Sequence, residues 1–188
     1  MKKLDDHEII ESVKRGNTSD YSLIIDRYKQ KAFSMIFRML KNRMDAEEVL
    51  QDCFVKAYNN LKSFKGDAQF STWFYRIVYN TTLSKLGMKK RQIEQSMLSI
   101  GDELDIEDLE ADTSGRKNAI KELVNTLVAK LPPNYSMVVN LFYMEEMSCE
   151  EIAEVMGTNT PNVKVLLHRS RTELKKLIKE NNLEDELR

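Results

Sequence analysis

The sequence predicts an all-α protein with two small helical domains joined by an acidic, flexible linker. Glycine and proline are scarce, with six Gly and three Pro among 188 residues. Apolar residues recur at helical spacing along most of the chain, and no strand-like alternation persists. Residues 99–115 carry seven acidic residues and no basic one, which leaves little apolar surface to stabilise a packed structure.

Four amphipathic helices fit the first domain, residues 1–92. The shortest is expected over 6–15, because a Gly-Asn pair follows it. The others are expected from residue 19 or 20 to about 40, from 45 with apolar positions to 61, and from 71 or 72 to about 88. The linker is assigned to residues 93–116, and the second domain to residues 117–188.

The second domain contains the pattern of a helix-turn-helix, preceded by helices expected over 120–131 and 135–143. Ser148 and Glu151 form a capping box, and Gly157 suits the end of the short helix between them. Thr160 as N-cap and a first-turn proline then begin the long last helix. In this motif the second helix enters the major groove of DNA, whereas a solvated helical hairpin is the alternative.

The last helix is basic although the whole chain is not. A formal net charge of −1 and a pI near 6.2 argue mildly against a nucleic-acid binder. Salt screens charges beyond about 10 Å, however, so local patches matter more than the sum. From Lys164 to Lys179 there are six Lys or Arg and one acid, Glu173. The residues that helical spacing can direct toward DNA are Lys164, His168, Arg169 and Arg171.

Residues 70–80 gather five of the fifteen Phe, Tyr and Trp residues of the chain. On a helix, the side expected to pack in the core carries Trp73, Phe74, Ile77 and Val78. The side expected to face solvent carries Thr72, Tyr75, Arg76, Tyr79 and Asn80. Rings beside a cation hold unpaired bases, with stacking worth roughly 1–3 kcal/mol per base, so the second side is interpreted as a surface for melted DNA. Burial of all the rings is the alternative.

The segments on either side of this stretch also suit DNA. The preceding loop, with Phe64 and Gly66 among small or polar residues, is a place for one flipped base. The following segment has no acid between Thr81 and Gln92, and its cations suit a phosphate backbone. These cations are Lys85, Lys89, Lys90 and Arg91.

The third helix carries a polar face opposite its apolar seam, formed by Asp45, Glu48, Gln51 and Asp52. Solvation is the simplest explanation of such a face. A docking surface for a basic or amphipathic partner helix is the alternative.

Several classes of protein are disfavoured. Cys53 and Cys149 lie far apart, and neither a disulfide framework nor metal spacing is present. No apolar run approaches the roughly 20 residues of a membrane span, and the N-terminus turns acidic at once, so a cytoplasmic protein without membrane insertion is expected. The two histidines, His7 and His168, belong to no nucleophile–base arrangement, so neither an enzyme nor a cofactor is expected.

Three segments in series resemble the extracytoplasmic-function (ECF) group of the sigma-70 RNA polymerase sigma factors. DAEEVLQDCFVKAYNNL is similar to the family segment that binds the clamp helices of the largest polymerase subunit. FSTWFYRIVYNTTLSKLGMKKR is similar to the region 2 stretch that melts and reads the −10 element. LPPNYSMVVNLFYMEEMSCEEIAEVMGTNTPNVKVLLHRSRTELKKL resembles region 4, which reads the −35 element.

The resemblance implies a role for each matching position. The expected polymerase contacts are Asp45, Glu48, Gln51 and Asp52. The expected contacts to the −10 element are Phe64, Lys65, Gly66, Asp67, Trp73, Tyr75, Arg76, Tyr79, Asn80, Lys89, Lys90 and Arg91. Those to the −35 element are Asn162, Lys164, Val165, His168, Arg169 and Arg171. The implied partners are core RNA polymerase (clamp helices and flap), promoter DNA and a possible anti-sigma factor.

The chain departs from the family pattern at two places. Ser84 and Gly87-Met88 stand where the family often has Asp-x-x-Arg-Arg, and Val165-Leu166 replaces a usual Ser-Arg. These departures bear on backbone contacts and promoter sequence, not on the fold. A conventional helix-turn-helix regulator with a sensing or dimerising N-terminal domain remains the alternative, although it leaves the solvent-facing aromatic side unexplained.

Overall fold

The structure, a computed structural model, describes residues 4–96, 116–181 and 183. All the regular secondary structure of these residues is helical, which confirms the all-α prediction. The α-helices are α1 (Asp6–Lys14), α2 (Tyr21–Leu40), α3 (Arg43–Asn60), α4 (Phe70–Ser96), α5 (Arg116–Lys130), α6 (Pro133–Tyr143), α7 (Cys149–Met156) and α8 (Thr160–Glu180). Two 3-10 turns, η1 (Thr18–Asp20) and η2 (Leu61–Ser63), join the first helices. The acidic stretch 99–115 lies outside the described residues.

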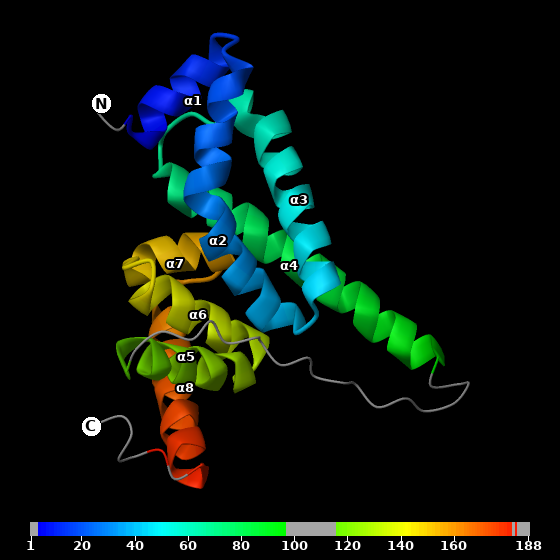
Figure 1. Cartoon of the computed structure of the whole chain (residues 1–188), viewed down its shortest axis with the longest axis vertical. Helices are drawn as coiled ribbons and strands as arrows, with labels where there is room; N and C mark the ends of the chain where they lie inside the picture. The colour runs from blue at the N-terminus through cyan, green and yellow to red at the C-terminus, as the bar shows by residue number, and fades with distance from the viewer. Residues whose placement is uncertain (1–3, 97–115, 182, 184–188) are drawn as a thin grey trace.

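Helices α2, α3 and α4 form the first bundle, and α1 packs across its upper end (Figure 1). Aromatic rings fill its centre. The ring of Phe74 stacks on Phe54 of α3 with centroids 5.0 Å apart, and it meets Tyr28 of α2 edge-on at 5.4 Å. Phe70 lies parallel to Phe74 at 5.9 Å. Burial of these large rings supplies much of the driving force that holds α4 between its neighbours.

Helices α5 to α8 form the second bundle, and α7 and α8 make the expected helix-turn-helix. The capping box of Ser148 and Glu151 is present, and Gly157 ends α7 in the left-handed region, with φ +63°. Asn159, not Thr160, caps α8, because its side chain accepts a hydrogen bond from the backbone N–H of Asn162. The predicted cap of the last helix was therefore displaced by one residue.

The two bundles pack directly on each other. Helix α6 lies against α2, α7 lies against α4, and α5 touches α2 (Figure 1). The buried apolar residues consequently form one cluster that runs through both bundles. The C-terminal half of α4 projects away from this contact, toward the lower right of Figure 1.

Helix α4 is longer than the sequence indicated, since it continues past Met88 to Ser96. Gly87 does not end it, because a single glycine costs a helix only about 1 kcal/mol relative to alanine. The Arg91 side chain donates a hydrogen bond to the Gly87 carbonyl at 3.2 Å, and no proline follows to stop the helix.

The packing around Cys53 predicts an inert thiol. Burial raises the pKa of Cys53 to about 12, although a hydrogen bond with Thr81 partly opposes the rise. At pH 8 a thiol with that pKa is deprotonated in only about one molecule in ten thousand. We expect a disulfide reagent such as DTNB to titrate the partly exposed Cys149 in native protein and Cys53 only after unfolding in guanidinium. In Cys149→Ser the rapid native reaction should vanish; equal native rates for the two thiols would contradict this packing.

Candidate nucleic-acid interface

The aromatic side of α4 that was expected to face solvent is largely covered. Tyr75 is fully buried, Tyr79 is 6% exposed and Thr72 is 3% exposed. Only Arg76 and Asn80 of that set are exposed. The expectation of a continuous exposed stripe was therefore wrong in this arrangement of the two bundles.

The second bundle is what covers the two tyrosines. The Tyr75 hydroxyl donates a hydrogen bond to the Glu145 carboxylate at 2.5 Å, just after α6. The Tyr79 hydroxyl donates to the side-chain oxygen of Asn134 at 3.1 Å. Burial raises the pKa of both tyrosines, and the nearby charge of Glu145 adds to the rise for Tyr75. Contacts between residues so far apart in the chain cannot be predicted from the sequence around either residue.

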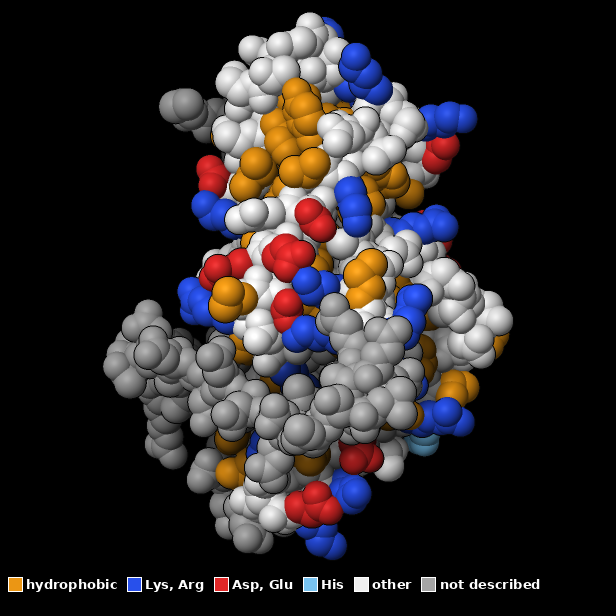
Figure 2. Space-filling model, turned by 90° about the vertical axis from the view of Figure 1, so that its right-hand side faces the viewer, with side chains coloured by type: hydrophobic (Ala, Val, Ile, Leu, Met, Phe, Trp, Pro, Cys, Tyr) orange, Lys and Arg blue, Asp and Glu red, His pale blue; other side chains and the backbone are white. Residues whose placement is uncertain are grey.

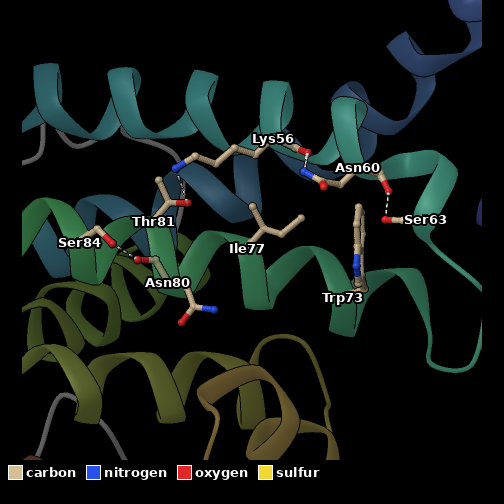
Figure 3. Close-up of a pocket in the computed structure, with 8 residues that line it drawn as sticks. All are labelled: Lys56, Asn60, Ser63, Trp73, Ile77, Asn80, Thr81 and Ser84. Atoms are coloured by element: carbon tan, nitrogen blue, oxygen red, sulfur yellow. Dashed lines mark hydrogen bonds between the residues drawn. The ribbon is translucent and has the colours of Figure 1, made fainter.

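A hollow of about 390 Å³ lies on the uncovered side of α4, where α3 crosses it (Figure 3). It is lined from α3 and η2 by Lys56, Asn60 and Ser63, and from α4 by Trp73, Ile77, Asn80, Thr81 and Ser84. The Lys56 ammonium lies 3.3 Å from the Thr81 hydroxyl. The Ser84 hydroxyl donates to the Asn80 carbonyl at 2.9 Å, and no hydrogen bond from another described residue occupies the Asn80 amide.

The lining of this hollow suits a nucleobase. Trp73, half-buried against Phe64 and Phe70, supplies an aromatic wall on which a base can stack. The amide of Asn80 offers a donor and an acceptor to base edges, and Lys56 offers a positive charge. The Asn60 side-chain nitrogen donates to the Lys56 carbonyl at 2.8 Å, which leaves its oxygen as an acceptor. Sequence reasoning identified Trp73 and Asn80 but not Lys56 and Asn60. On α3 alone those two residues look like ordinary solvated positions.

The loop before α4 is anchored from α1. Phe64, expected to touch DNA, is buried, and Lys14 donates to its carbonyl at 2.8 Å while lying over its ring. The tip residues Lys65, Gly66 and Asp67 are exposed, and Gly66 has φ +83°, a left-handed conformation that glycine adopts without strain.

A second hollow of about 470 Å³ separates this loop from the start of α1. Its walls are Asp5, Asp6, His7 and Ile10 from the N-terminal segment and Phe64, Gly66, Asp67, Ala68, Gln69 and Phe70 from the loop. The contribution of α1 to the loop site was not apparent in the sequence, since more than fifty residues separate the two segments.

The acidic face of α3 and the basic part of α4 form ion pairs with each other. Lys85 pairs with Glu48 at 2.6 Å and with Asp45 at 3.4 Å, and Lys89 also pairs with Asp45. Figure 2 shows acidic and basic side chains side by side on this face of the molecule. Partial burial raises the pKa of Asp45, but the two lysines more than offset this and hold the pKa below its usual value.

Other residues assigned to this surface face solvent. Gln51 and Asp52 on α3 are exposed, as are Lys90 and Arg91 on α4.

Helix α8 separates a buried side from a solvent-facing side. Val163, Leu167 and Ser170 are buried against the rest of the second bundle. All six residues assigned to the −35 element are exposed on the other side: Asn162, Lys164, Val165, His168, Arg169 and Arg171. This arrangement leaves the outer side of α8 open to a major groove.

One of the six is held in place by α6. The Arg171 side chain donates to the Tyr143 hydroxyl at 2.7 Å, and its guanidinium lies over the rings of Phe142 and Tyr143, 5.7 and 5.6 Å from their centroids. Such contacts reduce the conformational freedom that an arginine loses when it binds phosphate.

Within the described residues no helix has both the length and the apolar character of a membrane span. The same residues contain no group of three His, Cys, Asp or Glu side chains placed to hold a metal.

Comparison with known families gives two matches along the chain. The Sigma-70 region 2 family model matches residues 24–92, and the Sigma-70 region 4 model matches residues 121–174. The first covers α3 and most of α2 and α4, and the second covers α6, α7 and most of α8. Both hollows and the exposed side of α8 thus lie wholly or largely within the matched regions.

Individual proteins are similar over nearly the full length. The ECF RNA polymerase sigma factor SigW of Bacillus subtilis is 34% identical over 178 residues, which is 91% of this chain and 95% of the relative. The RNA polymerase sigma-H factor of Pseudomonas aeruginosa is 28% identical over 92% of this chain and 93% of its own. Among solved structures, the sigma factor RpoE bound to the anti-sigma factor NepR, from Bartonella quintana, has a TM-score of 0.68 at 18% identity, covering 85% of this chain and 97% of that one.

Proposed function

The chain belongs to the ECF RNA polymerase sigma factors of the sigma-70 family, and we propose that α4 and α8 are its two promoter-reading surfaces. Its function is to direct core RNA polymerase to promoters and to start transcription. Sigma factors act as transcription initiation factors. In this chain α8 reads the DNA duplex, and the surface beside α4 binds unpaired bases.

The exposed side of α8 is the observation that carries this proposal. Asn162, Val165 and Arg169 recur at helical spacing on this side, and Lys164, His168 and Arg171 flank them as further contacts to bases or phosphates. The opposite side of α8 is fixed by the second bundle, so these side chains enter the −35 major groove as a rigid set.

Beside α4, the two hollows supply places for melted bases of the −10 element. Trp73 and Asn80 line the hollow against α3, where Lys56 and Asn60 add a charge and an amide. The loop tip at Lys65, Gly66 and Asp67 borders the other hollow and takes the flipped base. Lys90 and Arg91, which are exposed on α4, contact the DNA backbone.

The polymerase contact is assigned to α3. Gln51 and Asp52 present a free polar surface to the clamp helices, whereas Asp45 and Glu48 must first exchange the lysines of α4 for groups of the partner. The two binding events therefore share Lys85 and Lys89, since release from α3 frees these cations for DNA phosphates.

Three partners are proposed for the chain: core RNA polymerase, promoter DNA and an anti-sigma protein. The similarity to a sigma factor solved with its anti-sigma factor supports an anti-sigma protein as a regulator of this chain as well. Promoter DNA and core polymerase are the direct partners, and the chain acts where they are, in the cytoplasm.

Asn80→Ala tests the hollow between α3 and α4. We expect promoter opening to fall about tenfold or more, because one hydrogen-bonding base contact is worth about 1–3 kcal/mol. A potassium permanganate footprint of unpaired thymines measures opening, and co-purification with core polymerase should stay unchanged. Asn59→Ala, an exposed amide on α3 outside the hollow, is the matched control. Normal opening by Asn80→Ala would remove this residue from −10 readout.

Arg169→Ala tests the exposed side of α8. Loss of one phosphate-neutralising cation should weaken binding of polymerase holoenzyme to promoter DNA and reduce the magnitude of its salt slope by about one unit. Lys179→Ala removes the same charge about 15 Å further along the helix and should leave the slope nearly unchanged. If the two variants have identical slopes, Arg169 does not contact the DNA.

Gln51→Ala combined with Asp52→Lys tests the face of α3. The reversed charge should repel a basic or amphipathic clamp helix and weaken binding to core polymerase about tenfold, as measured by competition with a labelled wild-type chain. Asp26→Lys, a charge reversal on an exposed part of α2, serves as the control. Wild-type competition by the double variant would exclude this face from the polymerase contact.

A further inference from the structure

Helix α6 ends on an exposed aromatic ring. The residues before it, Val138, Val139 and Leu141, are buried in the second bundle, whereas Tyr143, the last residue of α6, is 49% exposed. Helix α6 packs against α8 (Figure 1), and this contact brings the Tyr143 hydroxyl within 2.7 Å of the Arg171 side chain. A tyrosine with one end packed and the other in water is typical of a binding surface.

Arg171 lies on the flank of α8 that borders α6. Four exposed residues, spaced by four, three and four positions, form one stripe along this flank: Lys164, His168, Arg171 and Lys175. Arg169 is on the other flank, because two helical positions are about 200° apart. An α-helix, roughly 10–12 Å across, is about as wide as the major groove, so its two flanks meet the backbones on opposite sides of the groove. The stripe therefore faces one of the two DNA backbones.

We propose that Tyr143 and Arg171 form one phosphate-binding site, which holds a phosphate of this backbone between the phenol hydroxyl and the guanidinium. The proposal rests on the promoter function of α8 given above. It adds a DNA contact from outside the helix-turn-helix, and it makes Tyr143 the residue that positions Arg171.

The Arg171 guanidinium is fixed at one edge and free at the other. Its Nε donates to the Tyr143 hydroxyl, and its central carbon lies over the rings of Phe142 and Tyr143. Neither of its terminal nitrogens donates to another described residue. These two nitrogens form the fork that binds two oxygens of one phosphate. Because the side chain is already held, it loses little conformational entropy when the phosphate binds.

The Tyr143 hydroxyl supplies a further donor. It accepts the hydrogen of Nε, so its own proton remains available, and no other described residue accepts that proton. A ligand that satisfies both groups must offer several acceptor oxygens and a negative charge. A phosphate has both properties.

The stripe favours a DNA phosphate over a protein carboxylate as the ligand. From Lys164 to Lys175 it extends about 16 Å along α8, at 1.5 Å per residue. A DNA strand presents a phosphate for roughly every 3.4 Å of the helix axis, whereas a single carboxylate would use only one end of the stripe. Glu173, the only acid between these two lysines, is two positions from Arg171 and therefore on another side of α8.

Tyr143→Phe tests the hydroxyl, because it keeps the ring beneath Arg171 and removes only the oxygen. The affinity of the holoenzyme for a promoter duplex that it transcribes should fall about fivefold or more, since a hydrogen bond to a charged group is lost. The salt slope should stay nearly unchanged, because no charge is removed. Tyr135→Phe, near the other end of α6, is the matched control and should bind as wild type. Thermal unfolding verifies that both variants keep the packing of the second bundle.

Arg171→Gln tests the charge and the coupling between the two residues. It should weaken binding about tenfold and reduce the magnitude of the salt slope by about one unit. The double variant with Tyr143→Phe should be at most about twofold weaker than Arg171→Gln alone, because both groups bind the same phosphate.

Methylphosphonate substitution, which removes the charge of one phosphate at a time, locates the site on the DNA. At one position beside the −35 element it should weaken binding by wild type and Tyr135→Phe about tenfold, and by Arg171→Gln less than about twofold.

Wild-type affinity of Tyr143→Phe would overturn the role of Tyr143, and tighter binding would overturn it as well, since the hydroxyl would then withhold Arg171 from DNA. Equal sensitivity of wild type and Arg171→Gln to every methylphosphonate would overturn the phosphate contact. Weaker association of the variants with core polymerase, at unchanged DNA affinity of the holoenzyme, would reject DNA in favour of a protein carboxylate. Failure of the promoter function of α8 would appear separately, as an unchanged salt slope for Arg169→Ala.

Discussion

Helix α4 has to pack on two sides at once, and the remaining helices are placed by that constraint. One side buries Phe70 and Phe74 among α2 and α3. The adjacent side buries Tyr75 and Tyr79 against the second bundle. In the N-terminal half of α4 only a narrow strip remains for solvent, and it is bordered by the hollow that Trp73 and Asn80 line. This half of the helix can bind DNA on that strip, or on its other sides after a packing contact is lost.

Acidic and basic side chains of this protein neutralise one another at short range, in addition to balancing in the net charge. The acidic face of α3 neutralises Lys85 and Lys89 of α4, and Glu145 neutralises Lys31. By contrast, Glu173 and Glu180 of α8 pair with Lys176 of the same helix, and the cations assigned to the −35 element are exposed. The near-zero net charge therefore coexists with a surface suited to DNA, because the pairs remove charge from the rest of the molecule at short range.

The sequence was sufficient for features that depend on nearby residues. The all-α class, the capping box at Ser148 and the exposure of Lys164, His168, Arg169 and Arg171 on α8 were predicted from local pattern, and the structure agrees with them. Contacts between distant segments were not predictable in this way. The burial of Tyr75 depends on a residue seventy positions later, and the hollow beside α4 depends on how α3 crosses it. For the same reason the pairing of Lys89 with Asp45 was missed. The roles of the individual contact residues remain predictions.

The turn after α6 places a single carboxylate where it meets both α2 and α4. The same carboxylate oxygen accepts from Lys31 of α2 and from Tyr75 of α4, so a change in either donor alters the surroundings of the other. Substitutions at these positions of α2 and α4 should therefore be non-additive in their effect on stability, although the two side chains come from different helices.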